Sequence, residues 1–284
     1  MKFLIIDRDT VTTQLLQAKL VGLGHEVDIE PSKSAALNLM IKERHEGIFL
    51  DPAPLNNARP VVSGLRRSVN YLPYVTIISA DINEEEGVKA GANYVLSKPT
   101  SPDLLDEVSG NVERLVGLIR HLGDETTDFP SAGGVIAKSA VNQLFLSALE
   151  RADRYAETTF MVFIGIENYD DIFNLDGKMA ANYSAAKLSR HLVNIRRQSD
   201  IIAQTGQSEY CLLLQRPRYN SEPIEAARRF ADSLARIDDI TEVENSLIKV
   251  NIRLLEIPSG KLHANYLLEY NKDGLVKDNV SQTA

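Results

Sequence analysis

The sequence predicts an α/β domain built on a doubly wound parallel sheet, followed by a second domain of the α+β class with a mixed sheet. Three observations support this expectation. The chain has 284 residues, which suits two domains of about 150 residues each. Short apolar runs alternate with helical segments as far as residue 122, as they do in a parallel sheet covered by helices. Beyond residue 134, longer helical segments surround a hairpin signal, which is typical of an α+β domain.

Composition and charge exclude several classes of protein. Hydrophobic residues make up 44% and charged residues 25% of the chain, which is typical of a globular protein rather than a disordered or fibrous one. The net charge of −8 argues against a general nucleic-acid binder. Cys211 is the single cysteine, so an internal disulfide and a multi-cysteine metal site are excluded. No apolar stretch approaches the length of about 18 residues that a membrane span needs, and we expect a cytoplasmic protein that binds neither membranes nor nucleic acids.

Four apolar runs in the first 122 residues have the character of buried parallel strands. They are too short for helices, lack polar alternation, and cover residues 3–6, 47–50, 75–78 and 94–96. The polar side chains that follow these runs are Asp7, Asp9, Asp51, Ser79 and Lys98. The carboxyl ends of parallel strands meet at one edge of the sheet, where such domains bind ligands. Carboxylates, a hydroxyl and an ammonium at that edge suit a cation together with a phosphoryl group.

The same region resembles the receiver domain of bacterial response regulators. The resemblance covers residues 1–122 and rests on the segments FLIIDRD, GIFLD, VTIISA and GANYVLSKP. It implies a five-stranded parallel sheet in which Asp51 is the phosphoacceptor of a two-component phosphorelay, with a histidine kinase as the donor. It further implies that Asp7 is an acid of a magnesium site, and that Ser79 and Lys98 sense the phosphoryl group.

Arg8 departs from the receiver pattern, because that position usually holds a second acid of the magnesium site. A guanidinium carries a permanent positive charge and repels a metal ion. We hypothesise that Arg8 takes the place of the cation and pairs with Asp51, so that no cofactor is required. If the pocket nevertheless holds magnesium, Asp7 and Asp51 are the candidate ligands. Asp9 either supplements them or caps the helix that follows.

A long helix is predicted over residues 104–122, at the end of the first domain. Its apolar positions recur at about 3.5 residues, at Leu105, Val108, Val112, Leu115, Ile119 and Leu122. The stripe suits either packing against the domain's own sheet or a homodimeric coiled coil, and both alternatives stay open. Residues 123–134 are rich in Gly, Pro, Ser, Thr and Asp and are interpreted as a linker.

The second domain is predicted to cover residues 135–275, with a frayed tail at 276–284. Its expected helices are 141–152, 181–195 and 221–237, and its expected strands are 160–166, 200–204, 209–214 and 247–257. The strands 200–204 and 209–214 flank Gly206, which can take the positive φ of a tight turn. They are therefore expected to form a hairpin.

This region resembles a GGDEF diguanylate cyclase domain. The matching segments are ALERADRY, IGIENYDDIFN, TGQSEY and ANYLLEYNKDG, the last of which is expected to be a late helix. The family motif is eroded, because its five positions hold Gly206, Gln207, Ser208, Glu209 and Tyr210. The resemblance places the two metal-binding acids at Ser208 and Gly165, and the guanine contacts at Phe173 and Asn182. Magnesium needs anionic oxygens beside a triphosphate, so we expect no cyclase activity and no enzyme.

One ligand site of the family is retained. Arg197 and Asp200 precede Gly206 at the spacing of the family's inhibitory site, which binds cyclic di-GMP. A guanidinium can grip phosphate or a guanine edge, and a carboxylate accepts two N–H bonds from guanine. The family also uses a second arginine, for which the candidates are Arg228, Arg229 and Arg236. The alternative is a structural remnant, in which Arg197 and Asp200 form only a surface ion pair.

Three functions are compatible with these features. The sequence favours a non-catalytic signal-transduction protein that binds cyclic di-GMP through Arg197 and Asp200 and acts on a downstream protein effector. The first alternative is a phosphorylation-dependent response regulator that accepts a phosphoryl group at Asp51. The second alternative is a scaffold in which both sites are vestigial and only the protein surfaces act.

Overall fold

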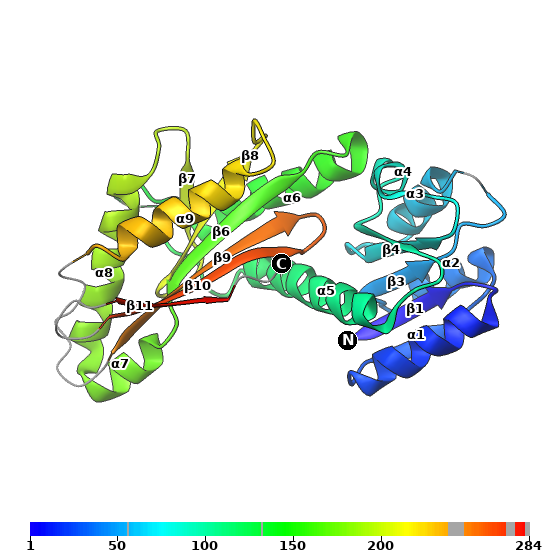
Figure 1. Ribbon diagram of the computed structural model, residues 1–284, viewed down its shortest axis with the longest axis horizontal. Helices are drawn as coiled ribbons and strands as arrows, with labels where there is room; N and C mark the ends of the chain where they lie inside the picture. Colours follow the sequence, from blue (N-terminus) through cyan, green and yellow to red (C-terminus); the bar gives the residue numbers. More distant parts are fainter. Residues whose placement is uncertain (56, 132, 238–246, 271–275, 282–284) are drawn as a thin grey trace. The chain divides into compact units, whose positions relative to one another are not determined.

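The computed structural model describes residues 1–284 apart from 56, 132, 238–246, 271–275 and 282–284. The described chain divides into two compact units (Figure 1). Unit 1 contains Met1–Arg120, Leu149–Glu157 and Pro258–Gly260, and unit 2 contains His121–Ala148, Thr158–Ile257 and Lys261–Ala284. Each unit is built around a β-sheet of its own.

Unit 1 contains a five-stranded parallel sheet with the strand order β2-β1-β3-β4-β5. Its strands are β1 (Lys2–Ile6), β2 (Glu26–Ile29), β3 (Gly47–Leu50), β4 (Tyr74–Ser79) and β5 (Tyr94–Ser97). This order is that of a doubly wound fold, so the predicted fold class is confirmed. Strands β1, β3 and β4 are almost entirely buried, which explains their continuous apolar runs, whereas β2 is partly exposed and has no such run.

The helices of this region cover both faces of the sheet, with α1 on the opposite side from α2 and α3 (Figure 1). They are α1 (Thr10–Gly22), α2 (Lys33–Lys42), α3 (Arg59–Arg67), α4 (Glu84–Lys89) and α5 (Pro102–Gly123). Capping residues in the sequence explain several of their first turns. The carboxylate of Asp9 caps α1, and Asn83 and Glu86 form a reciprocal capping box on α4. None of the described helices is both long enough and apolar enough to cross a membrane.

The apolar stripe of α5 is buried. Leu105, Val108, Val112 and Leu115 are at most 2% exposed. Burial of these side chains within a single chain is what the packing alternative predicts for the stripe.

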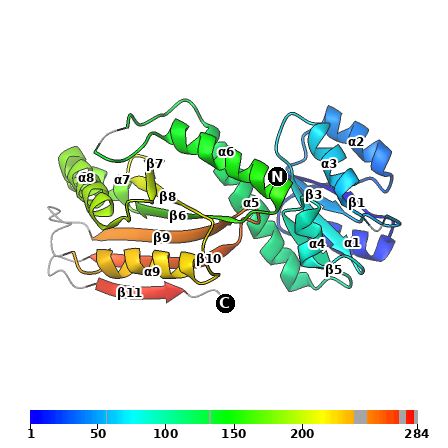
Figure 2. The same cartoon turned by 90° about the horizontal axis from the view of Figure 1, so that it is seen from above.

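Unit 2 contains a six-stranded sheet with the strand order β11-β10-β9-β6-β8-β7. Its strands are β6 (Thr159–Ile166), β7 (Ile201–Gln204), β8 (Glu209–Gln215), β9 (Ile248–Ile257), β10 (Leu262–Tyr270) and β11 (Val276–Ser281). Every described pairing between these strands is antiparallel, and the parallel contact in this part of the chain is the isolated bridge Ile136–Ala203. The expectation of a mixed sheet is thus corrected, because β8 and β9, which flank β6, both run against it (Figure 2).

Two segments near the end of the chain differ from the sequence prediction. The segment 264–274, expected to be a helix, lies in β10 up to Tyr270, and its residues 271–274 fall outside the described residues. The buried side chains of β10 alternate along the chain, at Ala264, Tyr266, Leu268 and Tyr270, and a period of two is that of a strand. The predicted tail is also wrong over Val276–Ser281, which forms β11 and pairs with the open edge of β10.

Two helices of unit 2 pack against one face of this sheet and share a hydrophobic core with it. The second half of the chain contains α6 (Lys138–Tyr155), α7 (Tyr169–Leu175), α8 (Gly177–Ile195) and α9 (Glu222–Leu234). Leu188 and Leu192 of α8 and Phe230 and Leu234 of α9 are fully buried in this core. Because both helices are held there, the turn after α8 and the first turn of α9 have defined positions.

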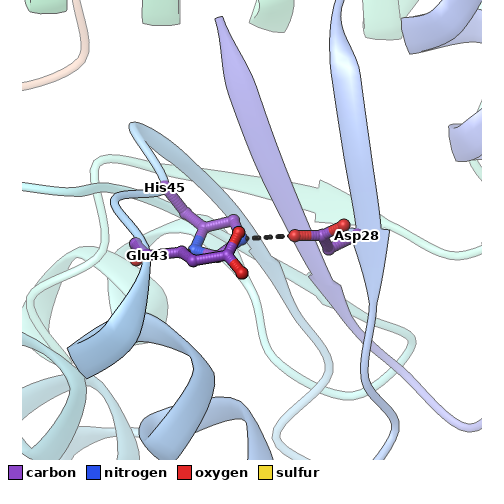
Figure 3. Close-up of side chains that lie close together, drawn as sticks. All are labelled: Asp28, Glu43 and His45. Atoms are coloured by element: carbon purple, nitrogen blue, oxygen red, sulfur yellow. Dashed lines mark hydrogen bonds and ion pairs between the residues drawn. The ribbon is translucent and has the colours of Figure 1, made fainter.

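A cluster of charged side chains joins β2 to the segment between α2 and β3 (Figure 3), and Lys2 of β1 pairs with its two acids. His45 is fully buried, and its Nε2 lies 2.9 Å from Asp28 Oδ2. The Lys2 ammonium pairs with the carboxylates of Asp28, at 2.9 Å, and of Glu43. The possible metal-ligand atoms of Asp28, Glu43 and His45 lie within 4.8 Å of one another, but the two acids already share the ammonium of Lys2. We therefore interpret the cluster as a structural ion-pair network.

Replacing Asp28 with asparagine is expected to destabilise unit 1 in a pH-dependent way. Hydrogen bonds from His45 and Lys2 lower the pKa of the Asp28 carboxyl. A lowered folded-state pKa contributes stability above the unfolded value of about 3.9, and this stability is lost as the pH falls through the folded value. Because the Asp28 side chain is 36% exposed and water screens its pairs, urea unfolding at pH 7 should show a loss of only about 0.5 to 1 kcal/mol. The loss should disappear in acid, and Glu26→Gln, an exposed change on the same strand, should have no effect. An equal loss at neutral and acid pH would contradict this role.

Candidate functional site

The carboxyl ends of the parallel strands bring the predicted receiver residues together. Asp7 follows β1, Asp51 follows β3, Ser79 ends β4 and Lys98 follows β5. The registers of these four strands end at the same edge of the sheet. The backbone N–H of Lys98 donates to the backbone carbonyl oxygen of Ser79 at 3.0 Å, and this hydrogen bond joins the ends of β4 and β5.

Lys98 bridges the two acids of this pocket. Its Nζ lies 2.8 Å from Asp7 Oδ2 and also pairs with Asp51 Oδ2. The side chains of Asp7 and Asp51 are 1% and 16% exposed. Burial alone lowers the pKa of Lys98, but the hydrogen bonds from its ammonium to Asp51 and Asp7 outweigh burial and raise the pKa. A single ammonium of the chain is therefore shared by both carboxylates.

Arg8 does not take the position that the sequence predicted for it. The partner of Asp51 is Lys98, and Arg8 is exposed. Arg8 lies in a bend beyond the end of β1, and its side chain forms none of the ion pairs found at Asp7 or Asp51 among the described residues. A second lysine, Lys33, donates to the backbone oxygen of Ala53 at 2.6 Å. Burial lowers the pKa of Lys33; the nearby charge of Asp51 opposes this shift, and the charge of Arg8 adds to it.

The two other predicted pocket residues stabilise local structure. Asp9 accepts a hydrogen bond from the backbone N–H of Val11, which is the capping alternative. Ser79 Oγ accepts hydrogen bonds from the backbone N–H groups of Asp81 and Ile82. Magnesium needs free anionic oxygens, but the two acids of the pocket share an ammonium. In this structure a magnesium ion would therefore compete with the ammonium of Lys98 for the oxygens of Asp7 and Asp51.

The turn between β7 and β8 holds the eroded motif of unit 2. Ser208 is 9% exposed, and its hydroxyl donates to a backbone oxygen of β6 at 3.2 Å. Gly165 has no side chain to offer, and a Cβ at this position would lie 3.2 Å from the backbone oxygen of Ser208. Glu209, the acid that the motif retains, accepts hydrogen bonds from Thr205 at 2.8 Å and from Arg253 at 3.0 Å. These three motif positions therefore provide no unpaired carboxylate for magnesium.

The predicted guanine position is occupied by neighbouring side chains. Asn182 Oδ1 accepts hydrogen bonds from the Tyr169 hydroxyl at 2.7 Å and from Gln207 Nε2 at 3.5 Å. The other predicted position holds Phe173, which is 42% exposed and has no hydrogen-bonding group. A guanine base would have to replace both internal hydrogen bonds of Asn182 before it could bind there. The described structure therefore pairs the Asn182 side-chain oxygen within the chain and offers no polar group at Phe173.

Arg197 and Asp200 line a cavity of about 790 Å³ in unit 2. Its walls are the turn between α8 and β7, the end of β8 with the loop that follows, and the first turns of α9. Asp200 accepts a hydrogen bond from the backbone N–H of Arg197 at 2.9 Å, and its side chain is 9% exposed. The side chain of Arg197 is 60% exposed. The volume is within the range of small-ligand sites, about 300 to 1,000 Å³, and both predicted residues contribute to one concave surface.

Arg229 is the second arginine of this cavity. Its Nη2 lies 3.4 Å from Asp200 Oδ2, and its buried Nε has no hydrogen-bond partner among the described residues. Arg228 and Arg236 line a separate cavity of about 580 Å³, which Arg229 also borders. Successive residues of a helix point about 100° apart, so Arg228 and Arg229 cannot face the same side of α9. Of the three candidates, Arg229 is therefore the one that faces Asp200.

Several residues of this cavity were not anticipated from the sequence. They are Arg216, Arg218, Tyr219 and Glu222. The signal that could have identified the first three is the segment Arg-Pro-Arg-Tyr directly after a predicted strand, since guanidinium groups and an aromatic ring suit phosphates and bases. With Arg197 and Arg229, the lining contains more arginines than carboxylates, although the chain as a whole has a net charge of −8.

The solved structures that are similar to this chain fall into two groups. In the first group, a two-component response regulator from Clostridium difficile is 21% identical over 41% of this chain and 98% of its own, with a TM-score of 0.37. The chemotaxis protein CheY4 of Vibrio cholerae is 24% identical over 39% of this chain and 97% of its own, with a TM-score of 0.36. In the second group, the GGDEF domain of YfiN from Pseudomonas aeruginosa is 17% identical over 43% of this chain and 78% of its own, with a TM-score of 0.36.

No protein-family model and no curated protein matches the sequence. The two folds of the chain are therefore assigned from its own strand orders and helices. They are those of a response-regulator receiver fold followed by a GGDEF-like α+β fold.

Removing the ammonium of Lys98 is expected to destabilise unit 1 strongly. Lys98→Met leaves Asp7 and Asp51 side by side without a cation, and breaking such a buried pair costs about 3 to 5 kcal/mol. Hydrogen exchange of peptides from β1 and β3 would measure the loss. Lys89→Met, which removes an exposed lysine paired with Glu85, should cost less than about 0.5 kcal/mol. Adding Asp51→Asn to Lys98→Met should restore part of the stability, and a Lys98→Met protein as stable as the native one would refute the bridging role.

Proposed function

We propose that this chain is a non-catalytic signalling protein that binds cyclic di-GMP in the cavity of unit 2 and passes the bound state to a protein partner. The observation that carries the proposal is the placement of Arg197 and Arg229 around the buried carboxylate of Asp200 in one cavity. In this proposal, the two guanidinium groups bind phosphodiester oxygens. Asp200 accepts N–H bonds from the edge of a guanine.

The magnitudes are consistent with this assignment. Each charge-assisted hydrogen bond contributes about 1.5 to 3 kcal/mol, so four of them give roughly 6 to 12 kcal/mol before losses. Micromolar binding requires about 8 kcal/mol net, and association itself has an entropic cost. Stacking of a guanine on the half-exposed ring of Tyr219 is a further favourable contribution in this proposal.

The proposal includes the absence of cyclase activity. Two positions where the resemblance expects metal-binding acids hold Gly165 and Ser208, and Asn182 is hydrogen-bonded to its own neighbours. Cyclisation of GTP needs metal-bound triphosphate, whereas binding of the finished dinucleotide in the cavity needs neither a metal nor these positions. Loss of catalysis and retention of binding are therefore compatible in one domain.

For the receiver-type pocket we propose a structural role that does not depend on phosphorylation. The support is the ammonium of Lys98, which already pairs with both Asp7 and Asp51. The alternative, a phosphoryl group on Asp51, is favoured by the position of this carboxylate at the edge of the sheet beside a lysine. The two proposals differ in whether beryllofluoride binds.

Calorimetry on the full chain tests the binding proposal. Titration with cyclic di-GMP should give a dissociation constant in the low micromolar range or below, and Arg197→Ala should remove the signal, because the phosphate then has no guanidinium at that wall. Arg228→Ala is the matched control, since this exposed arginine is on the same helix as Arg229 but outside the cavity. It should bind as the native protein does. An absence of heat at about 100 µM ligand would reject the proposal and favour the scaffold alternative.

Beryllofluoride with magnesium tests the receiver-type pocket. We expect the NMR amide signals around Asp51 to stay where they are, because the ammonium of Lys98 takes the place that a divalent cation needs. The Asp51→Asn protein provides the baseline. Shifts that occur in the native chain and are absent from Asp51→Asn would establish the phosphorylation alternative instead.

A further inference from the structure

A second carboxylate lies inside the cavity, directly against Arg197. It belongs to Glu222, the first residue of α9. Glu222 Oε1 lies 3.4 Å from Arg197 Nη1, and Oε2 accepts a hydrogen bond from the backbone N–H of Arg218 at 2.7 Å. The Glu222 side chain is 24% exposed, so the contact is partly withdrawn from water. Since a backbone N–H holds one oxygen, the other oxygen is directed at the guanidinium.

Glu222 presents to Arg197 the same chemical group that a phosphodiester would present. Both are anions with two oxygens that share one negative charge, and both suit the fork of a guanidinium. Arg229 and Asp200 form the corresponding pair on the other side of the cavity. In the ligand-free chain, each of these two arginines is therefore paired with a carboxylate of the chain itself. A phosphate that binds the Nη1 group of Arg197 competes with Glu222 for it.

We propose that Glu222 is an internal competitor that sets the affinity of the cavity for its anionic ligand. The proposal rests on the binding of cyclic di-GMP proposed above and adds the residue that limits it. Exchange of the Glu222 carboxylate for a ligand phosphodiester keeps the charge of Arg197 compensated in both states. Glu222 thus disfavours weakly held anions, because a ligand that binds Arg197 Nη1 has to displace an acid that is already held by the backbone of Arg218.

Calorimetry with cyclic di-GMP on Glu222 variants of the full chain tests this role. Glu222→Gln keeps an acceptor for the backbone of Arg218 but removes the charge that faces Arg197, so the affinity should rise about three- to five-fold. Glu222→Asp retains an acid at the first position of α9 but is shorter by one methylene, and it should give a smaller rise. Asp232→Asn is the matched control. It removes one negative charge from the same helix about 15 Å further along, and it should leave the affinity unchanged.

Each result of this series decides between the proposals. Tighter binding by both Glu222 variants, with no gain for Asp232→Asn, supports the competitor role. Binding by Glu222→Gln alone, with none by the native chain, also supports it. Native binding that Glu222→Gln leaves unchanged or weakens overturns the competitor role, and the proposed function stands. An absence of binding by the native chain and by all variants overturns both proposals. Urea unfolding of each variant checks that the fold is retained.

Discussion

A carboxylate that is withdrawn from water needs a cation, and this constraint governs both candidate sites. Without a partner, a buried acid destabilises the fold or loses its charge. In unit 1, the ammonium of Lys98 compensates Asp7 and Asp51 together. In unit 2, the guanidinium of Arg253 compensates Glu209. At both places a cation that pairs with the acids is a side chain of this chain.

The same constraint separates positions that stabilise the fold from positions that suit a ligand. In unit 1, a magnesium ion would compete with the ammonium of Lys98 for the oxygens of the two acids. A displaced Lys98 would be left unpaired although its side chain is only 17% exposed. The cavity of unit 2 has the opposite balance, with more arginines than carboxylates. Arg197 is also 60% exposed, and its contact with Glu222 is a weak one of the kind that water and ligands can replace. An anion is therefore the ligand for which the cavity is suited.

Much of the fold could be predicted because burial leaves a clear pattern in the sequence. Strands covered on both faces, such as β3 and β4, have continuous apolar runs. The pattern was ambiguous in β10, where five of the seven residues in ANYLLEY are apolar and suit a helix as well as a strand. Pairing with β9 on one side and β11 on the other decided in favour of the strand. Such pairing joins distant segments and is not visible in a local window.

The candidate sites show the same division between local and distant information. Arg197 and Asp200 could be recognised because their spacing along the chain is short and Asp200 folds back onto the backbone of Arg197. The choice of Arg229 over its neighbour depends on the rotation of α9 about its axis, which the core residues of that helix determine. The position of Glu222 depends on the same rotation and on the loop that ends β8. The packing of α9 thus positions both Arg229, which completes the cavity, and Glu222, which opposes its ligand. A change that rotates α9 would affect both residues together.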